Sequence, residues 1–300
     1  MDATKSTLIG TIALGMWATL ALFTALSGDV PPFQLVAMSF TLGSLMALAK
    51  WLWRGERVLD RLRQPVGAWA LGVFGLFGYH FFYFLALRQA PALQANLLNY
   101  LWPLLIVLFS ALLPGHRLLA RHVAGGLMGL AGAVLLVGGG GAVAFEPAHA
   151  LGYASAVVCA VIWAAYSVAN RRYAHVPTDA VGGFCAATAL LALVCHLAFE
   201  ATVVPQGGEW LAILGLGLGP VGAAFFAWDH GVKHGDVRAL GILAYAVPLM
   251  STGLLIAFGR AEADGTVAAA CALIIGGALL GTGNVFRRRA RPSPPSSSRH

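Results

Sequence analysis

Among the ionisable side chains inside long and mostly apolar stretches, His80 and Asp229 are the candidates for chemistry. An ionisable group in such a stretch is a candidate for binding a polar solute or carrying a proton, because its burial is costly. Asp229 lies four residues before Lys233, so an ion pair along one helix is the structural alternative to a coupling or gating role. For His80, a hydrogen-bonded structural histidine and a contact with substrate or protons both stay open.

Aromatic and amide side chains recur near the middle of the same stretches. Asn96, Asn99, Tyr100 and Pro103 follow at the spacing i, i+3, i+4 and i+7, which is one face of a helix. Trp102 falls off that face and is expected to pack. Tyr and Trp normally collect at membrane interfaces, so polar rings at mid-span should face the interior of a bundle. The sequence therefore predicts a substrate cavity, with hydrogen bonds between helices as the alternative, lined by Trp17, His80, Tyr83, Asn96, Asn99, Tyr100, Trp163, Tyr166 and Tyr245.

The sequence contains no recognisable catalytic constellation. The lone His80 and the isolated Asp229 do not form a nucleophile–base pair or a metal cluster, and the four cysteines form no C-x-x-C pair or metal-ligand spacing. No G-x-x-x-x-G-K pattern accompanies the glycine runs, so they cradle no phosphate. We therefore expect a protein that is not an enzyme and that holds no metal and no cofactor. A membrane-embedded enzyme or scaffold remains the alternative from a different class.

The elements that must position these residues are membrane-spanning helices. Charged residues make up only 10% of the 300 residues, against roughly 25% in a soluble domain. Uncharged stretches of about 20 residues have the length that crosses a hydrocarbon core, and the ten-residue alternation of a β-barrel is absent. The sequence predicts an all-α polytopic membrane protein with ten transmembrane helices, at residues 6–26, 33–53, 66–87, 92–112, 122–137, 151–172, 179–199, 210–231, 237–258 and 266–286.

The net charge of +7 is distributed unevenly between the two sides of this arrangement. With the N-terminus placed in the cytoplasm, all Lys and Arg residues except Arg88 and Arg260 fall in or beside cytoplasmic segments. This bias is typical of topology in a bacterial-type inner membrane and predicts that both termini are cytoplasmic. A lipid bilayer, and not nucleic acid, is therefore the partner that the charge indicates.

The chain repeats itself at a shift of 145 residues. Tyr100 and Pro103 then coincide with Tyr245 and Pro248. A five-helix unit that occurs twice must have opposite orientations in its two copies, which is the inverted-topology repeat common in secondary transporters. We expect a first repeat at residues 1–141, a second at 142–288 and a disordered cytoplasmic tail at 289–300. Pro103 and Pro248 are predicted as flex points of the two corresponding helices.

Two copies of a five-helix unit, the paired Y-x-x-P-L motif and the Gly/Ala-rich closing helices resemble the EamA-type branch of the drug/metabolite transporter superfamily. Within that branch, the sequence is most similar to the aromatic amino acid exporters. The resemblance covers nearly the whole chain, from about residue 8 to residue 286. It implies a ten-helix carrier with a central cavity between its two halves that exports small metabolites.

Charged residues that would bind phosphates or cations are missing from the predicted spans, which limits the expected classes of substrate. No Lys or Arg lies near the centre of a span, which argues against phosphorylated solutes. The first span has no carboxylate, in contrast to the small cation-drug exporters of the superfamily. We therefore expect a carrier or facilitator that exports aromatic and other neutral amino acids by alternating access, with other neutral metabolites or drugs as the alternative. Proton antiport and facilitated diffusion, the resting conformation, and the oligomeric state, a monomer among the options, stay open.

Overall fold

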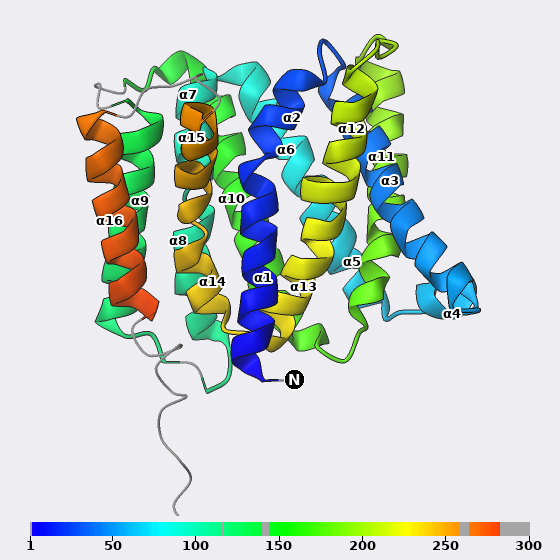
Figure 1. Ribbon diagram of the computed structural model, residues 1–300, viewed down its shortest axis with the longest axis horizontal. Helices are drawn as coiled ribbons and strands as arrows, with labels where there is room; N and C mark the ends of the chain where they lie inside the picture. Colours follow the sequence, from blue (N-terminus) through cyan, green and yellow to red (C-terminus); the bar gives the residue numbers. More distant parts are fainter. Residues whose placement is uncertain (1, 116, 140–143, 258–263, 283–300) are drawn as a thin grey trace, which may run out of the picture.

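The computed structural model describes residues 2–115, 117–139, 144–257 and 264–282, and these residues form helices and no strands. Ten helical segments within them are long and apolar enough to cross a membrane, which confirms the predicted fold class. They form one upright bundle in Figure 1. The predicted tail at 289–300 lies outside the described residues.

The described part of the first half contains nine α-helices, including a short one, α4, that projects sideways from the bundle in Figure 1. They are α1 (Ala3–Ala18), α2 (Leu20–Leu26), α3 (Pro32–Trp53), α4 (Val58–Leu62), α5 (Val66–Val73), α6 (Tyr79–Gln89), α7 (Ala92–Asn99), α8 (Trp102–Phe109) and α9 (Ala120–Val137). The described part of the second half contains α10 (Ala150–Ala169), α11 (Val181–Phe199), α12 (Glu209–Leu218), α13 (Ala224–His234), α14 (Val237–Leu243), α15 (Ala246–Ala257) and α16 (Gly265–Thr282).

Corresponding helices of the two halves pack against each other, as an inverted repeat requires. Helix α9 lies beside α16, and α3 lies beside α11. Glycines allow close contacts between helices: a Cβ atom added to Gly125 would lie 2.6 Å from the carbonyl oxygen of Gly277. The contact of Gly10 on α1 with Gly231 on α13 is equally close. In a membrane, such backbone proximity replaces the hydrophobic driving force between helices.

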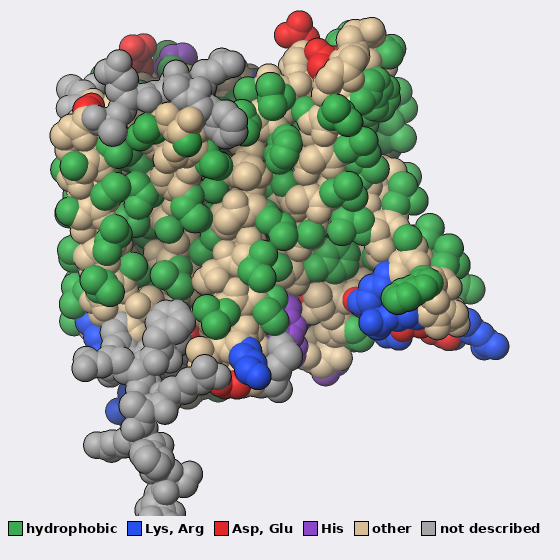
Figure 2. Space-filling view, in the orientation of Figure 1, with side chains coloured by type: hydrophobic (Ala, Val, Ile, Leu, Met, Phe, Trp, Pro, Cys, Tyr) green, Lys and Arg blue, Asp and Glu red, His purple; other side chains and the backbone are tan. Residues whose placement is uncertain are grey.

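Charged side chains mark the two ends of the bundle. Figure 2 shows Lys and Arg gathered along the lower edge, where α4 and the N-terminus lie, and a broad apolar belt above them. Large apolar residues in the belt are exposed, for example Leu190 at 66% and Leu279 at 70%. Such a belt is suited to contact with hydrocarbon chains.

Two spans are interrupted just before the paired prolines. Helix α7 ends at Asn99 and α8 begins at Trp102, while α14 ends at Leu243 and α15 begins at Ala246. Proline lacks an N–H donor, and its ring clashes with the carbonyl group four residues earlier, so a regular helix ends ahead of it. Both interruptions therefore lie at the paired prolines, and the role of these prolines as flex points stays a prediction.

Two further interruptions were not predicted. A π-helical turn at Phe74–Gly78 separates α5 from α6, and a second π-helical turn at Gly219–Ala223 separates α12 from α13. The two turns are also 145 residues apart, so they belong to corresponding places in the two repeats. Both contain glycines, which tolerate the irregular backbone, and such turns are frequent at functional sites.

The hydroxyl group of Tyr245 bridges the break between α7 and α8. It donates a hydrogen bond to the carbonyl oxygen of Tyr100 at 3.3 Å and accepts one from the N–H of Leu104 at 3.2 Å. Tyr245 is 0% exposed, so water does not replace these bonds. One side chain of the second repeat thus pairs two backbone groups that the break in the first repeat leaves open.

We predict that Tyr245→Phe lowers the free energy of unfolding by about 1–2 kcal/mol, because it leaves a buried N–H and a buried carbonyl group without this partner. Thermal denaturation in detergent would measure the effect. Tyr153→Phe is the matched control, since the Tyr153 hydroxyl accepts its hydrogen bond from the N–H of Glu146 in an exposed position. An equal loss in both variants would contradict the role given to Tyr245.

Candidate functional site

A cavity of about 870 Å³ lies between the two halves of the bundle. Its walls run from rings at mid-span to the connection between α2 and α3, at the upper end of Figure 1. Every residue predicted to line a cavity does so except Tyr166 and Tyr245. The residues brought together are Trp17, His80, Tyr83, Asn96, Asn99, Tyr100 and Trp163.

Tryptophan rings close the cavity toward the middle of the bundle. The ring centre of Trp17 lies 5.6 Å from that of Trp163 and 5.0 Å from that of Trp228. Trp102 lies edge-on to Trp228 at 5.9 Å. Trp228 is 0% exposed and lies beneath the lining, while the other three rings face the cavity. Offset and edge-on arrangements of this kind are favourable for aromatic rings.

Trp102 packs as expected, with ring contacts to Trp17 and Trp163, but it also lines the cavity, which was not expected. A continuous helix would turn Trp102 away from the face of Asn99 and Tyr100. The break after α7 restarts the helix at Trp102 itself, so its direction no longer follows the spacing of the preceding residues. Sequence reasoning also missed Tyr79 and Phe225 as lining residues. Tyr79 stands next to His80, and Phe225 is the repeat partner of His80, so the sequence offered a signal for each.

Hydrogen-bonded amides form one wall of the cavity between α6 and α7. Tyr83 donates its hydroxyl to Oδ1 of Asn96 at 2.7 Å, and Nδ2 of Asn99 donates to the hydroxyl oxygen of Tyr79 at 3.0 Å. The sequence raised a lined cavity and hydrogen bonds between helices as alternatives, and both are present here. The same side chains link neighbouring helices and present polar atoms to the cavity.

His80 is oriented by the first π-helical turn. Its Nδ1 lies 2.7 Å from the carbonyl oxygen of Leu76. A carbonyl oxygen only accepts, so we assign the proton of the neutral ring to Nδ1 and leave a lone pair on Nε2. The ring is fixed edge-on against Phe40 at 5.2 Å. In the neutral form of the ring, Nε2 is then the atom left to accept a hydrogen bond.

Tyr166 and Tyr245 lie outside the cavity lining. Tyr166 is 1% exposed and packs against Gly75 of the first π-helical turn, where a Cβ atom would come within 2.5 Å of the tyrosine ring. Tyr245 is held at the break between α7 and α8. Both tyrosines point into contacts between helices, which periodicity alone could not distinguish from contacts with the cavity.

Asp229 is part of a buried polar cluster beyond the closed end of the cavity. Its carboxylate accepts from Nζ of Lys233 at 2.9 Å, Nδ2 of Asn170 at 2.7 Å and the hydroxyl of Thr178 at 2.8 Å. Nζ of Lys233 also donates to the carbonyl oxygen of Val176 at 3.1 Å. The i, i+4 ion pair considered from the sequence is thus present, with both side chains almost fully buried.

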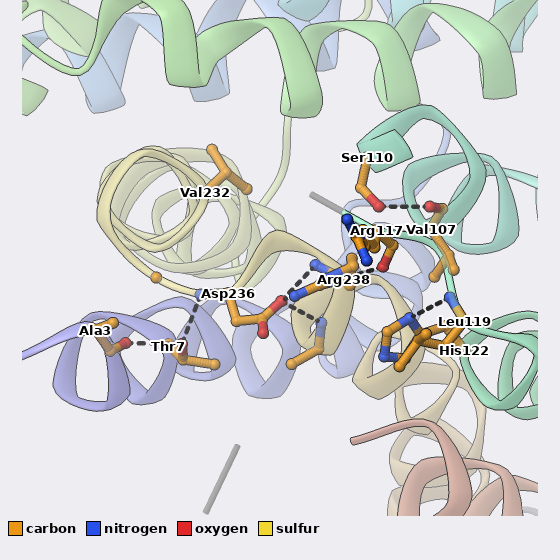
Figure 3. Close-up of polar contacts among 12 residues, drawn as sticks. Ala3, Thr7, Val107, Ser110, Arg117, Leu119, His122, Val232, Asp236 and Arg238 are labelled. Atoms are coloured by element: carbon orange, nitrogen blue, oxygen red, sulfur yellow. Dashed lines mark hydrogen bonds and ion pairs between the residues drawn. The ribbon is translucent and has the colours of Figure 1, made fainter. Parts of the chain in front are cut away.

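A second network ties α1, α14 and the segment before α9 together at the same end of the molecule (Figure 3). The N–H of Asp236 donates to the hydroxyl of Thr7 at 2.9 Å, and the Asp236 carboxylate caps α14 by accepting from two backbone N–H groups. Arg238 donates to the carbonyl oxygen of Arg117 at 3.0 Å. The bundle is therefore sealed by polar contacts at this end and open at the other.

The mouth of the cavity carries a different ion pair. The guanidinium of Arg88 lies 3.5 Å from the carboxylate of Glu200, and the Arg88 side chain is 48% exposed. Glu200 itself is buried and accepts from the N–H groups of Phe33 and Gln34 at the start of α3. Arg88 corresponds to Lys233 in the repeat, so related cations stand at the open and closed ends.

An inverted repeat with a cavity between its halves and interrupted helices beside that cavity defines a secondary-transporter type of membrane protein. The chain belongs to the EamA-like transporter family, whose sequence model matches twice, at residues 5–138 and 150–282. One match falls in each half of the bundle.

Relatives of known name agree with this family. The aromatic amino acid exporter YddG of Ancylobacter novellus is 56% identical over 283 residues, which cover 94% of this chain and 98% of that protein. The proteins of the same name from Salmonella typhimurium and Escherichia coli K12 are 28% and 26% identical and cover 85% and 93% of this chain, or 88% and 97% of their own lengths. A crystal structure with 55% identity superposes with a TM-score of 0.91 and covers 95% of this chain and 99% of its own.

We predict that Asp229→Ala destabilises the protein by about 3–5 kcal/mol, because it leaves the buried Lys233 without its counter-ion. The double variant Asp229→Leu with Lys233→Met should recover most of that loss, since it removes both charges. Melting temperatures in detergent would compare the three proteins. A double variant that is less stable than Asp229→Ala would contradict this account.

Proposed function

We propose that this transporter exports amino acids, with preference for aromatic and other neutral side chains. The observation that carries the proposal is the composition of the cavity wall, where tryptophan, tyrosine and phenylalanine rings surround amides and one imidazole. The name of the relative at 56% identity supports the same substrate class.

The chemistry of the wall suits a zwitterion with an apolar side chain. Aromatic rings offer flat apolar contact to the side chain, while the amides and hydroxyls of α6 and α7 offer hydrogen bonds to its ammonium and carboxylate groups. The acceptor at Nε2 of His80 suits an ammonium group. Arg88 is the one cation among the described lining residues and stands at the mouth, so a phosphate deep in the cavity would lack a charged partner.

We infer a bacterial-type inner membrane as the location, with both termini in the cytoplasm. The gathering of Lys and Arg at the end that carries α4 supports this orientation. The cavity then opens to the outside, and the cluster around Asp229 closes the cytoplasmic side. This would be the releasing state of an exporter.

The transport cycle proposed here exchanges the conformations of the two repeats, residues 1–141 and 142–288, so that the cavity opens alternately to each side. Pro103 and Pro248 serve as flex points of the interrupted helices. Asp229 is a candidate gating residue, because its cluster must open for the cytoplasmic side to open. His80 remains the candidate for proton coupling.

Phenylalanine transport by the purified protein in liposomes tests the proposal. We expect counterflow of labelled phenylalanine, with methionine and threonine as competitors, and a fall of about tenfold with Trp163→Ala, equivalent to 1.4 kcal/mol of lost stabilisation. Trp53→Ala is the control because Trp53 is 86% exposed on the outer surface. Transport of another neutral solute without transport of any amino acid would contradict the proposal.

The flex points can be tested separately. Pro103→Ala combined with Pro248→Ala would allow more regular helices across both breaks, so we expect slower turnover, by about tenfold, at little change in half-saturation concentration. Initial rates over a range of phenylalanine concentrations would separate the two quantities. Unchanged turnover would remove the role given to the prolines while leaving the cavity in place.

A further inference from the structure

Six lining residues of the cavity form three pairs that the repeat relates to each other. Trp17 corresponds to Trp163 at a shift of 146 residues, while His80 corresponds to Phe225 and Trp102 to Val247 at a shift of 145. Both members of each pair line the cavity. For most other lining residues, the repeat partner lies outside the cavity wall.

The first two pairs lie at the pseudo-two-fold axis that relates the halves. The ring centres of Trp17 and Trp163 are 5.6 Å apart, and those of His80 and Phe225 are 6.4 Å apart. A two-fold rotation that relates the repeats brings each ring close to the place of its partner, so two partner rings this near each other lie beside the axis. The axis therefore passes through the deep end of the cavity, between these rings.

Other lining residues have repeat partners that are buried in the closed half. Tyr83 corresponds to Trp228, and Arg88 corresponds to Lys233; Trp228 is 0% exposed and Lys233 is 3% exposed. Asn99 and Tyr100 correspond to Ala244 and Tyr245, which are both 0% exposed. In the opposite state these partners would take over the wall, and the present lining residues would be buried.

We propose that Trp17, Trp102, Trp163, His80, Phe225 and Val247 form a permanent substrate site that faces the cavity in both states of the cycle. The inference rests on the proposed alternating access: exchanging the repeats maps each pair onto itself, so its two members stay in the wall. Asn96, Asn99, Tyr83 and Tyr100 belong to the open side alone.

The two sets of residues imply a division of recognition. Five of the six members of the permanent site are aromatic or aliphatic, and the sixth is His80. The permanent site therefore recognises a flat apolar side chain throughout the cycle. The hydrogen-bonding amides and hydroxyls of α6 and α7 act on one side only. Selection by side chain is then equal from both faces of the membrane, while selection by head group differs between them.

Phe225 and Phe84 provide a matched pair of variants. Both are phenylalanines that line the cavity, on the repeat-related helices α13 and α6. The partner of Phe225 is the lining residue His80, whereas the partner of Phe84 is the buried Asp229. The proposal thus assigns Phe225 to both states and Phe84 to the open side only.

The test measures half-saturation concentrations for phenylalanine in right-side-out and inside-out membrane vesicles. Phe225→Leu should raise the value about fivefold at both faces, the size of one lost aromatic contact. Phe84→Leu should raise it only at the face that carries the α2–α3 connection. An effect of Phe225→Leu at one face alone, or equal effects of Phe84→Leu at both, would overturn the assignment.

Thiol labelling gives a second measurement that does not depend on the transported solute. Phe225→Cys and Phe84→Cys would be made with the four natural cysteines replaced by alanine, and treated with a membrane-impermeant reagent. Phe225→Cys should react from both faces and Phe84→Cys from one. If wild-type vesicles moved no aromatic amino acid, the proposed substrate would fail, and the labelling pattern would still decide for or against the permanent site.

Discussion

Backbone hydrogen bonding in hydrocarbon is the constraint on which the rest of this structure depends. The hydrocarbon core of a membrane holds no water that could pair with an opened carbonyl or N–H group. Each interruption of a spanning helix therefore needs a hydrogen-bonding partner from the protein. Three side chains act in this way: Tyr245 at the carbonyl oxygen of Tyr100, the imidazole of His80 at Leu76, and Nε1 of Trp17 at Pro220, 3.0 Å away. Two of these three also line the cavity.

This constraint explains why polar aromatic residues concentrate in the middle of the bundle. An irregular backbone is tolerated at membrane depth only where protein surrounds it or where it lines a cavity. A tyrosine, histidine or tryptophan supplies an apolar ring for packing and a single polar atom for the exposed backbone group. The π-helical turns and the breaks at proline thus require the same residue types that an aromatic substrate would contact.

Much of the fold and part of the site could be predicted from the sequence. The ten spans follow from apolar runs, and the inverted repeat follows from the shared shift of Pro103 and Pro248. The first π-helical turn could not be predicted, because Gly75 stands in a stretch that reads as continuous helix. The second contains Pro220, which was an available signal of an interruption. Each irregular turn changes the direction of the residues that follow it. For that reason Trp102 both packs and lines the cavity, while Tyr166 and Tyr245 pack between helices.

The absence of charge at the centre of the described cavity agrees with a cycle of alternating access. A charged side chain there would need a partner in every state, because an uncompensated charge in a closed cavity is strongly destabilising. The structure instead keeps ion pairs at the two ends, with Lys233 and Asp229 buried together and Arg88 beside Glu200 at the mouth. Neutral rings can be enclosed from either side at little electrostatic cost. A zwitterion between them can then use hydrogen bonds that come and go with the moving half, while its side chain remains against the same rings.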